Sequence, residues 1–467
     1  MEKLNKKSRR DFIKVASLAA LGVTTQASSM VKLKAINSLL MPPPPYNGFG
    51  NYKAMVYIFL GGGCDAFNML TPKSTTEYNE YSSVRGNLAI AQNSLLGINS
   101  NNFGLHPSLT DVHSIYNAGD LAFITNVGSM IEPVTLADFQ NGTAQLPLGL
   151  FSHLDQTNHW QTANPAVRTN KGWGGKIADL IGSTNVNNNI SMNISMSGSN
   201  IFQNGNLTTP YTMSSSGPKL PYGYGLTYGT HPVRSALIDS VMNYNYQDPY
   251  KKTYADTYNE SIEASNLLKQ EIDNLAPFAT SFSTNNLSEQ LEMVAKTIAV
   301  RSNLNFERQI FFINYGGWDH HDNLLIDQAD KLTVVNNALN EFKNVLNELG
   351  AFNDVTTLVS SEFGRTLTSN GDGSDHAWGG HSIVMGGSVI GGQLYGTYPT
   401  LAANSSLFIN PRGQIIPTTA TDSLFSELAL WYGVDPSDLT TIFPNLANFH
   451  NIATISTVNP PLGFMTM

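Results

Sequence analysis

Residues 313–325 read INYGGWDHHDNLL and bring four potential metal ligands together at the end of an apolar run. Asp319, His320, His321 and Asp322 follow one another directly after a segment typical of a buried strand. Carboxylate and imidazole side chains are common ligands of divalent metals. A histidine pair can equally lie on an ordinary surface or support a neighbouring group, so this segment alone leaves a structural role open.

Comparable groups follow two other apolar runs, 52–63 and 354–361, and fall in the loop after the second run. In an open α/β sheet, ligands bind beyond the carboxyl ends of the strands. We therefore expect these side chains to converge, and carboxylates gathered there would repel one another unless a cation or an arginine neutralised them. The residues concerned are Asp65, Glu362, Arg365, Asp375, His376 and His381.

A fifth group lies in LFSHLDQTNHW, which contains Ser152 and His153 at the expected start of a helix. A serine in that position would face an anion through free backbone N–H groups and the helix dipole. Arg365 could hold two oxygens of a phosphate or sulfate in a fork. These parts would serve hydrolysis or transfer of a phosphate or sulfate ester.

Simpler structural roles stay open for the same residues. Ser152 with Asp155 matches a helix-capping pattern, and Asp65 could cap the segment that follows it. Arg365 could simply pair with Glu362.

The sequence also limits which metal could be bound. The chain has one cysteine, Cys64, which excludes an intramolecular disulfide and a cysteine-rich metal site. The remaining ligand types suit Zn, Mn, Fe, Mg or Ca, and imidazole favours the first three. One divalent cation, or two about 4 Å apart, would polarise an ester oxygen and lower the pKa of a bound hydroxyl or water.

The elements that must position these residues alternate between strands and helices. Continuous apolar runs at 52–63, 121–127 and 354–361 are typical of buried parallel strands. Residues 331–349 place apolar side chains at spacings of three and four, which predicts a helix ending at Gly350. The pattern predicts an α/β fold with a doubly wound, mainly parallel sheet and helices on both faces. Residues 141–250 are rich in Asn, Ser, Gly and Tyr and predict a loop-rich insertion.

Composition narrows the class of partner. The chain has 467 residues, of which 41% are hydrophobic, enough for a substantial core. Its formal net charge is −9, and no basic stripe is present to neutralise phosphates, so nucleic acid is excluded as the expected partner. Charged residues make up 13%, below the usual ~25%, which suits a protein working outside the cytoplasm.

The N-terminal segment has the pattern of a targeting signal. SRRDFIK, followed by a short apolar stretch and small residues, predicts a twin-arginine export signal over residues 1–36 and use of the twin-arginine export machinery. An ordinary basic amphipathic start is the alternative. A Pro-rich spacer is expected at 37–51 and the folded domain at 52–467, with no transmembrane span in the mature chain. We expect a periplasmic, extracellular or cell-surface location.

Seven segments in order resemble the landmarks of the bacterial domain of unknown function 1501. They are SRRDFIK, FLGGGCDAFNML, FSHLDQ, GGWDHHDN, SSEFGRT, GSDHAWGG and PTTATDSLFSELALWYGV. The resemblance covers nearly the whole chain, to about residue 449, and that family is similar to the alkaline phosphatase and sulfatase superfamily. It implies an alkaline phosphatase-like fold.

The resemblance also implies roles for individual residues. By order along the chain, Asp65, Asp319 and His321 match metal ligands of the superfamily, and Ser152 matches its nucleophile. A final histidine ligand matches His376 or His381.

One position departs from the superfamily pattern. Glu362 stands in place of an aspartate, and Phe363 in place of the histidine that would follow it. Asp375 and His376 could fold back to supply the lost ligand, or the site could hold one metal. The short Cys/Ser-x-Pro-x-Arg signature of sulfatases does not occur, which argues against a formylglycine sulfatase.

These observations lead to a leading function and one alternative. The leading function is an exported, metal-dependent hydrolase or transferase of phosphate or sulfate esters, with a glycan or lipid as the carrier of the ester. Ser152 and Arg365 would be catalytic. The alternative is a non-catalytic exported module that binds a glycan or a protein through the insertion and has a degenerate metal site. The expected metal ligands are Asp65, Asp319, His321, Glu362, Asp375 and His376.

Overall fold

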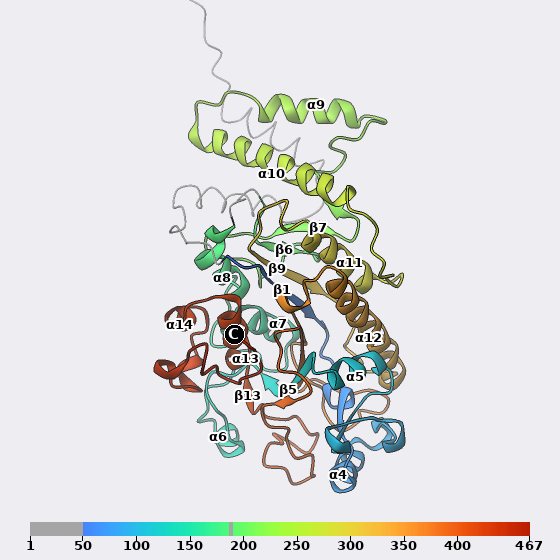
Figure 1. Ribbon diagram of the computed structural model, residues 1–467. Helices are drawn as coiled ribbons and strands as arrows, with labels where there is room; N and C mark the ends of the chain where they lie inside the picture. The colour runs from blue at the N-terminus through green and yellow to red at the C-terminus, as the bar shows by residue number, and fades with distance from the viewer. Residues whose placement is uncertain (1–49, 186–189) are drawn as a thin grey trace, which may run out of the picture.

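A computed structural model describes residues 50–185 and 190–467 (Figure 1). The expected export signal at 1–36, and the spacer up to residue 49, lie outside the described residues. Within the described part of the chain, no helix has the length and apolar character needed to cross a membrane.

The central element is a ten-stranded sheet in the order β12-β5-β11-β10-β1-β9-β6-β7-β8, with β13 pairing on β5. The strands are β1 (Lys53–Phe59), β5 (Leu121–Gly128), β6 (Asn193–Ser195), β7 (Tyr211–Ser214), β8 (Gly217–Pro218), β9 (Arg308–Asn314), β10 (Val355–Ser360), β11 (Gly380–Met385), β12 (Leu394–Tyr395) and β13 (Thr419–Ala420). A small antiparallel sheet of β2 (Leu70–Pro72), β4 (Phe103–Leu105) and β3 (Leu96–Ile98) stands apart from it.

Most pairings in the central sheet are parallel. β1 lies between β9 and β10 and is parallel to both, with Ile58 opposite Ile313 on one side and Val359 on the other. β11 runs antiparallel between β10 and β5, and β8 runs antiparallel on β7. The carboxyl ends of β1, β9 and β10 therefore lie at one edge of the sheet.

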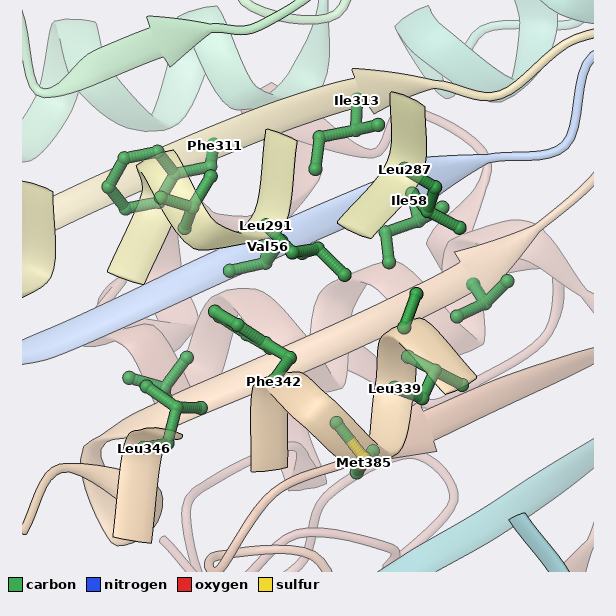
Figure 2. Close-up of a cluster of buried hydrophobic side chains, with 14 of the residues drawn as sticks. Val56, Ile58, Leu287, Leu291, Phe311, Ile313, Leu339, Phe342, Leu346 and Met385 are labelled. Carbon is green, nitrogen blue, oxygen red and sulfur yellow. The ribbon is translucent and has the colours of Figure 1, made fainter. Parts of the chain in front are cut away.

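Helices cover both faces of this sheet, as alternate residues of β1 demonstrate. Ala54, Val56 and Ile58 pack with apolar residues of α5, α11 and α12, and Figure 2 shows part of this cluster. Tyr57 and Phe59 face the other way, among residues of α7, α8, α13 and α14. The helices of the described chain are α3 (Ala66–Met69), α4 (Thr75–Arg85), α5 (Thr110–Asn117), α6 (Leu136–Asn141), α7 (His153–Thr162), α8 (Trp173–Ile181), α9 (His231–Met242), α10 (Pro249–Asp273), α11 (Asn286–Ala299), α12 (Leu324–Glu348), α13 (Thr421–Tyr432) and α14 (Leu439–Ile442).

The expected class, a mainly parallel sheet between two layers of helices, is confirmed. The region expected as a loop-rich insertion, 141–250, is more varied than that description. Its first half supplies α7, α8 and β6 to the main layers. In its second half, α9 lies against α10 at one end of the molecule, beyond β7 (Figure 1). None of the twelve residues of α9 is buried.

Candidate metal centre

Three loops meet where β1, β9 and β10 end. The Leu60 N–H donates to Ser360 O at 2.7 Å, and the Trp318 N–H donates to Gly61 O at 3.1 Å. The Gly62 N–H donates to the Glu362 Oε1 atom at 2.8 Å. The convergence expected from the sequence therefore occurs at this edge, since the loops after all three strands are in direct contact.

At this edge, Asp319 lies at the centre of three histidines. Its Oδ1 atom is 2.9 Å from His321 Nε2 and 3.4 Å from His376 Nε2, and its Oδ2 atom is 3.3 Å from His153 Nε2. The two Nε2 atoms of His321 and His376 are 3.3 Å apart. We call His153, Asp319, His321 and His376 the histidine–aspartate cluster.

Each histidine of the cluster directs its other ring nitrogen at an oxygen atom. His153 Nδ1 lies 2.9 Å from Glu362 Oε1, and His321 Nδ1 lies 3.1 Å from Asp375 Oδ1. His376 Nδ1 lies 2.7 Å from the carbonyl oxygen of Phe151. Because these oxygens are acceptors, Nδ1 carries the proton in each neutral ring, and Nε2 presents a lone pair to the centre of the cluster.

Ligand atoms of three cluster residues, His153, Asp319 and His376, all lie within 4.8 Å of one another, close enough to bind one divalent ion. Zinc ligands at 2.0–2.1 Å in a tetrahedral arrangement lie about 3.3 Å from one another, and several separations in the cluster are 3.3–3.4 Å. His153 Nε2 is buried and makes no hydrogen bond, although it lies 3.3 Å from Asp319. Lone pairs facing each other at such distances are favourable when a cation lies between them.

The pKa values of the cluster reflect its mixture of burial and charge. The hydrogen bond to Glu362 raises the pKa of His153 above its ordinary value. Burial lowers the pKa of His376, which favours its neutral, ligand-competent form. For Asp319, burial acts to raise the pKa, but the hydrogen bond and charge of Arg365 outweigh it, and the pKa lies below the usual range.

Glu362 and Asp375, predicted as metal ligands, lie beside two histidines of the cluster. Each carboxylate contacts the outward nitrogen of a histidine instead of the centre of the cluster. Glu362 is 2% exposed and also accepts hydrogen bonds from the Gly62 N–H and the Ser361 hydroxyl. These two carboxylates therefore orient His153 and His321 and fix the ring tautomers.

Asp65, for which a ligand role was predicted, lies in a buried ion pair. Its carboxylate pairs with the guanidinium of Arg85, and both side chains are fully buried. The same arginine donates to the carbonyl oxygens of Thr366 and Leu367 at 3.1 Å. Asp65 thus has a cationic partner from α4 and is not one of the residues that face the cluster centre.

Arg365 is 1% exposed and uses its donors within the protein. Its Nη1 atom donates to Asp319 Oδ1 at 2.8 Å and to Gly62 O at 3.3 Å, and its Nη2 atom donates to Ser374 O. The guanidinium of Arg365 therefore forms a fork on protein groups, which ties the loops after β1, β9 and β10 together.

Ser152 is the N-cap of α7, and its hydroxyl accepts the Asp155 N–H at 3.4 Å. The capping alternative considered from the sequence is therefore present. The residue before it, Phe151, has a φ of 77°, a conformation that costs a bulky residue about 1–3 kcal/mol. In this conformation the carbonyl oxygen of Phe151 accepts a hydrogen bond from His376 Nδ1.

His153 is the cluster residue whose role sequence reasoning left open. His153 stands in the FSHLDQ segment, but a functional role was predicted there for the adjacent Ser152, which matches the nucleophile by order along the chain. His320 and His381, also left open, are buried at 6% and 5% exposure. His381 Nδ1 accepts the Asn126 N–H at 3.0 Å, and burial lowers its pKa to about 3, so it stays neutral.

Replacing Glu362 with leucine should weaken divalent-metal affinity about 10–100-fold, because His153 loses the carboxylate that fixes its tautomer. Glu362→Gln should lose less, since the amide oxygen can still accept the Nδ1 proton. Competition with a chromogenic chelator measures both affinities. Asp372→Asn, which alters an exposed carboxylate bound to the Asn323 N–H, is the control. Equal affinity in Glu362→Leu and wild type would contradict this orienting role.

Residues 235–412 match the family described as Protein of unknown function (DUF1501). The resemblance to DUF1501 inferred from the sequence is thus confirmed over this range. The DUF1501 match includes GGWDHHDN and GSDHAWGG, which supply Asp319, His321 and His376 to the cluster, and SSEFGRT, which contains Glu362 and Arg365. His153 lies outside the matched residues. No curated protein matches the chain.

Several solved structures align with most of the chain at low similarity. A sulfatase from Pseudoalteromonas sp. is 11% identical, covers 84% of this chain and 74% of its own, and has a TM-score of 0.32. The soluble domain of lipooligosaccharide phosphoethanolamine transferase A from Neisseria meningitidis is 10% identical, with coverages of 83% and 90% and a TM-score of 0.32. A lipoteichoic acid synthase from Listeria monocytogenes is 9% identical, with coverages of 71% and 62% and a TM-score of 0.26.

Proposed function

We propose that this protein is a metal-dependent hydrolase or transferase of phosphate or sulfate esters. The observation that carries the proposal is the convergence of three imidazole Nε2 atoms on the carboxylate of Asp319, with each Nδ1 atom held by an oxygen. A set of three nitrogens and one carboxylate favours Zn, Mn or Fe over Mg or Ca.

The charge balance of the site supports an anionic substrate only when a cation is bound. Asp319, Glu362 and Asp375 contribute three carboxylates, and Arg365 and Arg412 contribute two guanidinium groups, all linked by contacts at this edge. With neutral histidines the site carries one net negative charge, which repels an ester anion. A divalent ion reverses that sign.

Some residues of the site would hold the ion, and others fix the orientation and charge of those ligands. A bound divalent ion would polarise an ester oxygen and lower the pKa of water. His153, His321, His376 and Asp319 would hold it, and Arg365 keeps Asp319 ionised by pairing with its Oδ1 atom. Since the Ser152 hydroxyl serves as a helix cap, we propose water as the attacking group in place of that serine.

Export completes the proposal. We propose that residues 1–36 direct the chain through the twin-arginine machinery to the periplasm or cell surface, where a glycan or lipid carries the ester. The motif SRRDFIK supports this.

A chelator experiment tests the activity. The purified protein is assayed on aryl phosphate monoesters, aryl phosphate diesters and aryl sulfates, before and after metal removal and after addition of Zn, Mn or Fe. We expect turnover of at least one ester class, its loss on chelation, its return with metal, and its absence in His153→Ala. Metal bound at the cluster with no turnover of any ester would overturn the catalytic proposal.

A separate observation favours the alternative of a binding module. Helices α9 and α10, with the segments beside them, carry four tyrosines that are each at least 64% exposed: Tyr222, Tyr228, Tyr244 and Tyr250. Exposed tyrosines suit contact with a glycan or a protein. If His153→Ala leaves partner binding intact and the wild type turns over no ester, this alternative is supported.

A further inference from the structure

Arg412 is a half-exposed arginine that comes from a distant loop and contacts Asp375, a neighbour of the histidine–aspartate cluster. It lies in the turn at 410–413, and its carbonyl oxygen accepts the N–H and the hydroxyl of Thr368, each at 3.1 Å. Its Nη2 atom pairs with Asp375 Oδ2, and the other oxygen of that carboxylate lies 3.1 Å from His321 Nδ1. One carboxylate therefore joins Arg412 to a residue of the cluster.

Arg412 differs from the other arginines near this edge in exposure. The Arg412 side chain is 47% exposed, whereas those of Arg365 and Arg85 are 1% and 0% exposed. Arg365 uses its donors on Asp319, Gly62 and Ser374. Among the described residues, the contacts of the Arg412 guanidinium are confined to Asp375 through one nitrogen, so it keeps N–H donors for a further oxyanion.

We propose that Arg412, not Arg365, binds the non-bridging oxygens of the anionic ester group. A guanidinium matches the paired oxygens of a phosphate or sulfate, and Asp375 links this one to the outward nitrogen of His321 at the rim of the cluster. The inference rests on the proposed function because it assigns the recognition of the same substrate. It makes Arg412 a specificity-determining residue and gives Asp375 two tasks, orienting His321 and positioning Arg412.

Inorganic phosphate and inorganic sulfate are the probes, titrated separately into the metal-loaded protein by calorimetry. We expect Arg412→Met to weaken binding of the preferred anion about 10-fold or more, as loss of a charge-assisted hydrogen bond implies, and Arg412→Lys to weaken it less. The matched control is Arg168→Met, which removes a 66% exposed arginine paired with Asp155. It should bind the anion as the wild type does.

Metal affinity separates binding from structure. The inference requires Arg412→Met to keep wild-type metal affinity and thermal stability while anion affinity falls. Anion affinity unchanged in Arg412→Met, or a metal-loaded wild type that binds neither anion, would overturn it. A parallel fall in metal affinity would also overturn it, because Arg412 would then act through Asp375 and His321.

The outcome also distinguishes this inference from the proposed function. Arg412-dependent phosphate or sulfate binding without turnover of any ester would sustain the inference and reject catalysis. Ester turnover whose KM is the same in wild type and Arg412→Met would reject the inference and sustain catalysis.

Discussion

Replacing Asp319 with alanine should abolish divalent-metal binding and lower ester turnover by at least about 100-fold, equivalent to a loss of ~3 kcal/mol of transition-state stabilisation. Asp319 lies against the Nε2 atoms of all three histidines of the cluster, at 2.9–3.4 Å. Without it, three imidazoles lose the carboxylate at their centre, and the buried guanidinium of Arg365 loses its anionic partner.

The measurement is kcat/KM for the best ester substrate, together with metal per chain from elemental analysis. Asp322→Ala is the matched control, since it removes an exposed aspartate from the same turn. We expect Asp322→Ala to retain both the metal and the activity. If Asp319→Ala and Asp322→Ala behave alike, the cluster is not the metal centre.

Replacing Arg85 with methionine should destabilise the protein by about 3–5 kcal/mol, because it leaves the carboxylate of Asp65 buried without a partner. The carbonyl oxygens of Thr366 and Leu367 lose their donor at the same time. Urea unfolding at neutral pH, followed by tryptophan fluorescence, gives the free energy of unfolding.

The double variant Asp65→Leu/Arg85→Met is the control for this second prediction. Replacing both members of a buried ion pair by apolar residues is often close to neutral, so the double variant should recover much of the lost stability. Wild-type stability in Arg85→Met would contradict a structural ion pair. Loss of metal in Asp65→Asn with folding intact would instead return Asp65 to the ligand role predicted from the sequence.

The convergence of the loops after β1, β9 and β10 was predictable, because the sequence pattern indicates that these strands are parallel. Continuous apolar runs predicted β1, β9 and β10 as buried parallel strands, and parallel strands present their carboxyl ends at one edge. Asp319, His321 and His376 followed from that rule. The helical spacing that ends at Gly350 likewise predicted α12 from residue 331 onward, although the helix begins earlier, at Leu324.

The roles of side chains within the site were harder to predict. Asp65 and Glu362 each follow a strand, but whether a carboxylate faces a cation, an arginine or an imidazole depends on neighbours far along the chain. Arg85 neutralises Asp65 from α4, and Glu362 meets His153 from α7. A sequence gives no distance between such pairs. The same ligand role was therefore predicted for both carboxylates, although Asp65 contacts an arginine and Glu362 an imidazole.

The central claim is that one ion is held by His153, Asp319, His321 and His376, and anomalous diffraction at the zinc edge from zinc-loaded crystals tests it most directly. We predict one strong peak bonded at about 2.0–2.1 Å to the three Nε2 atoms and to an oxygen of Asp319. A peak coordinated by Asp65 or Glu362 without His153, or no peak at this edge of the sheet, would contradict the claim.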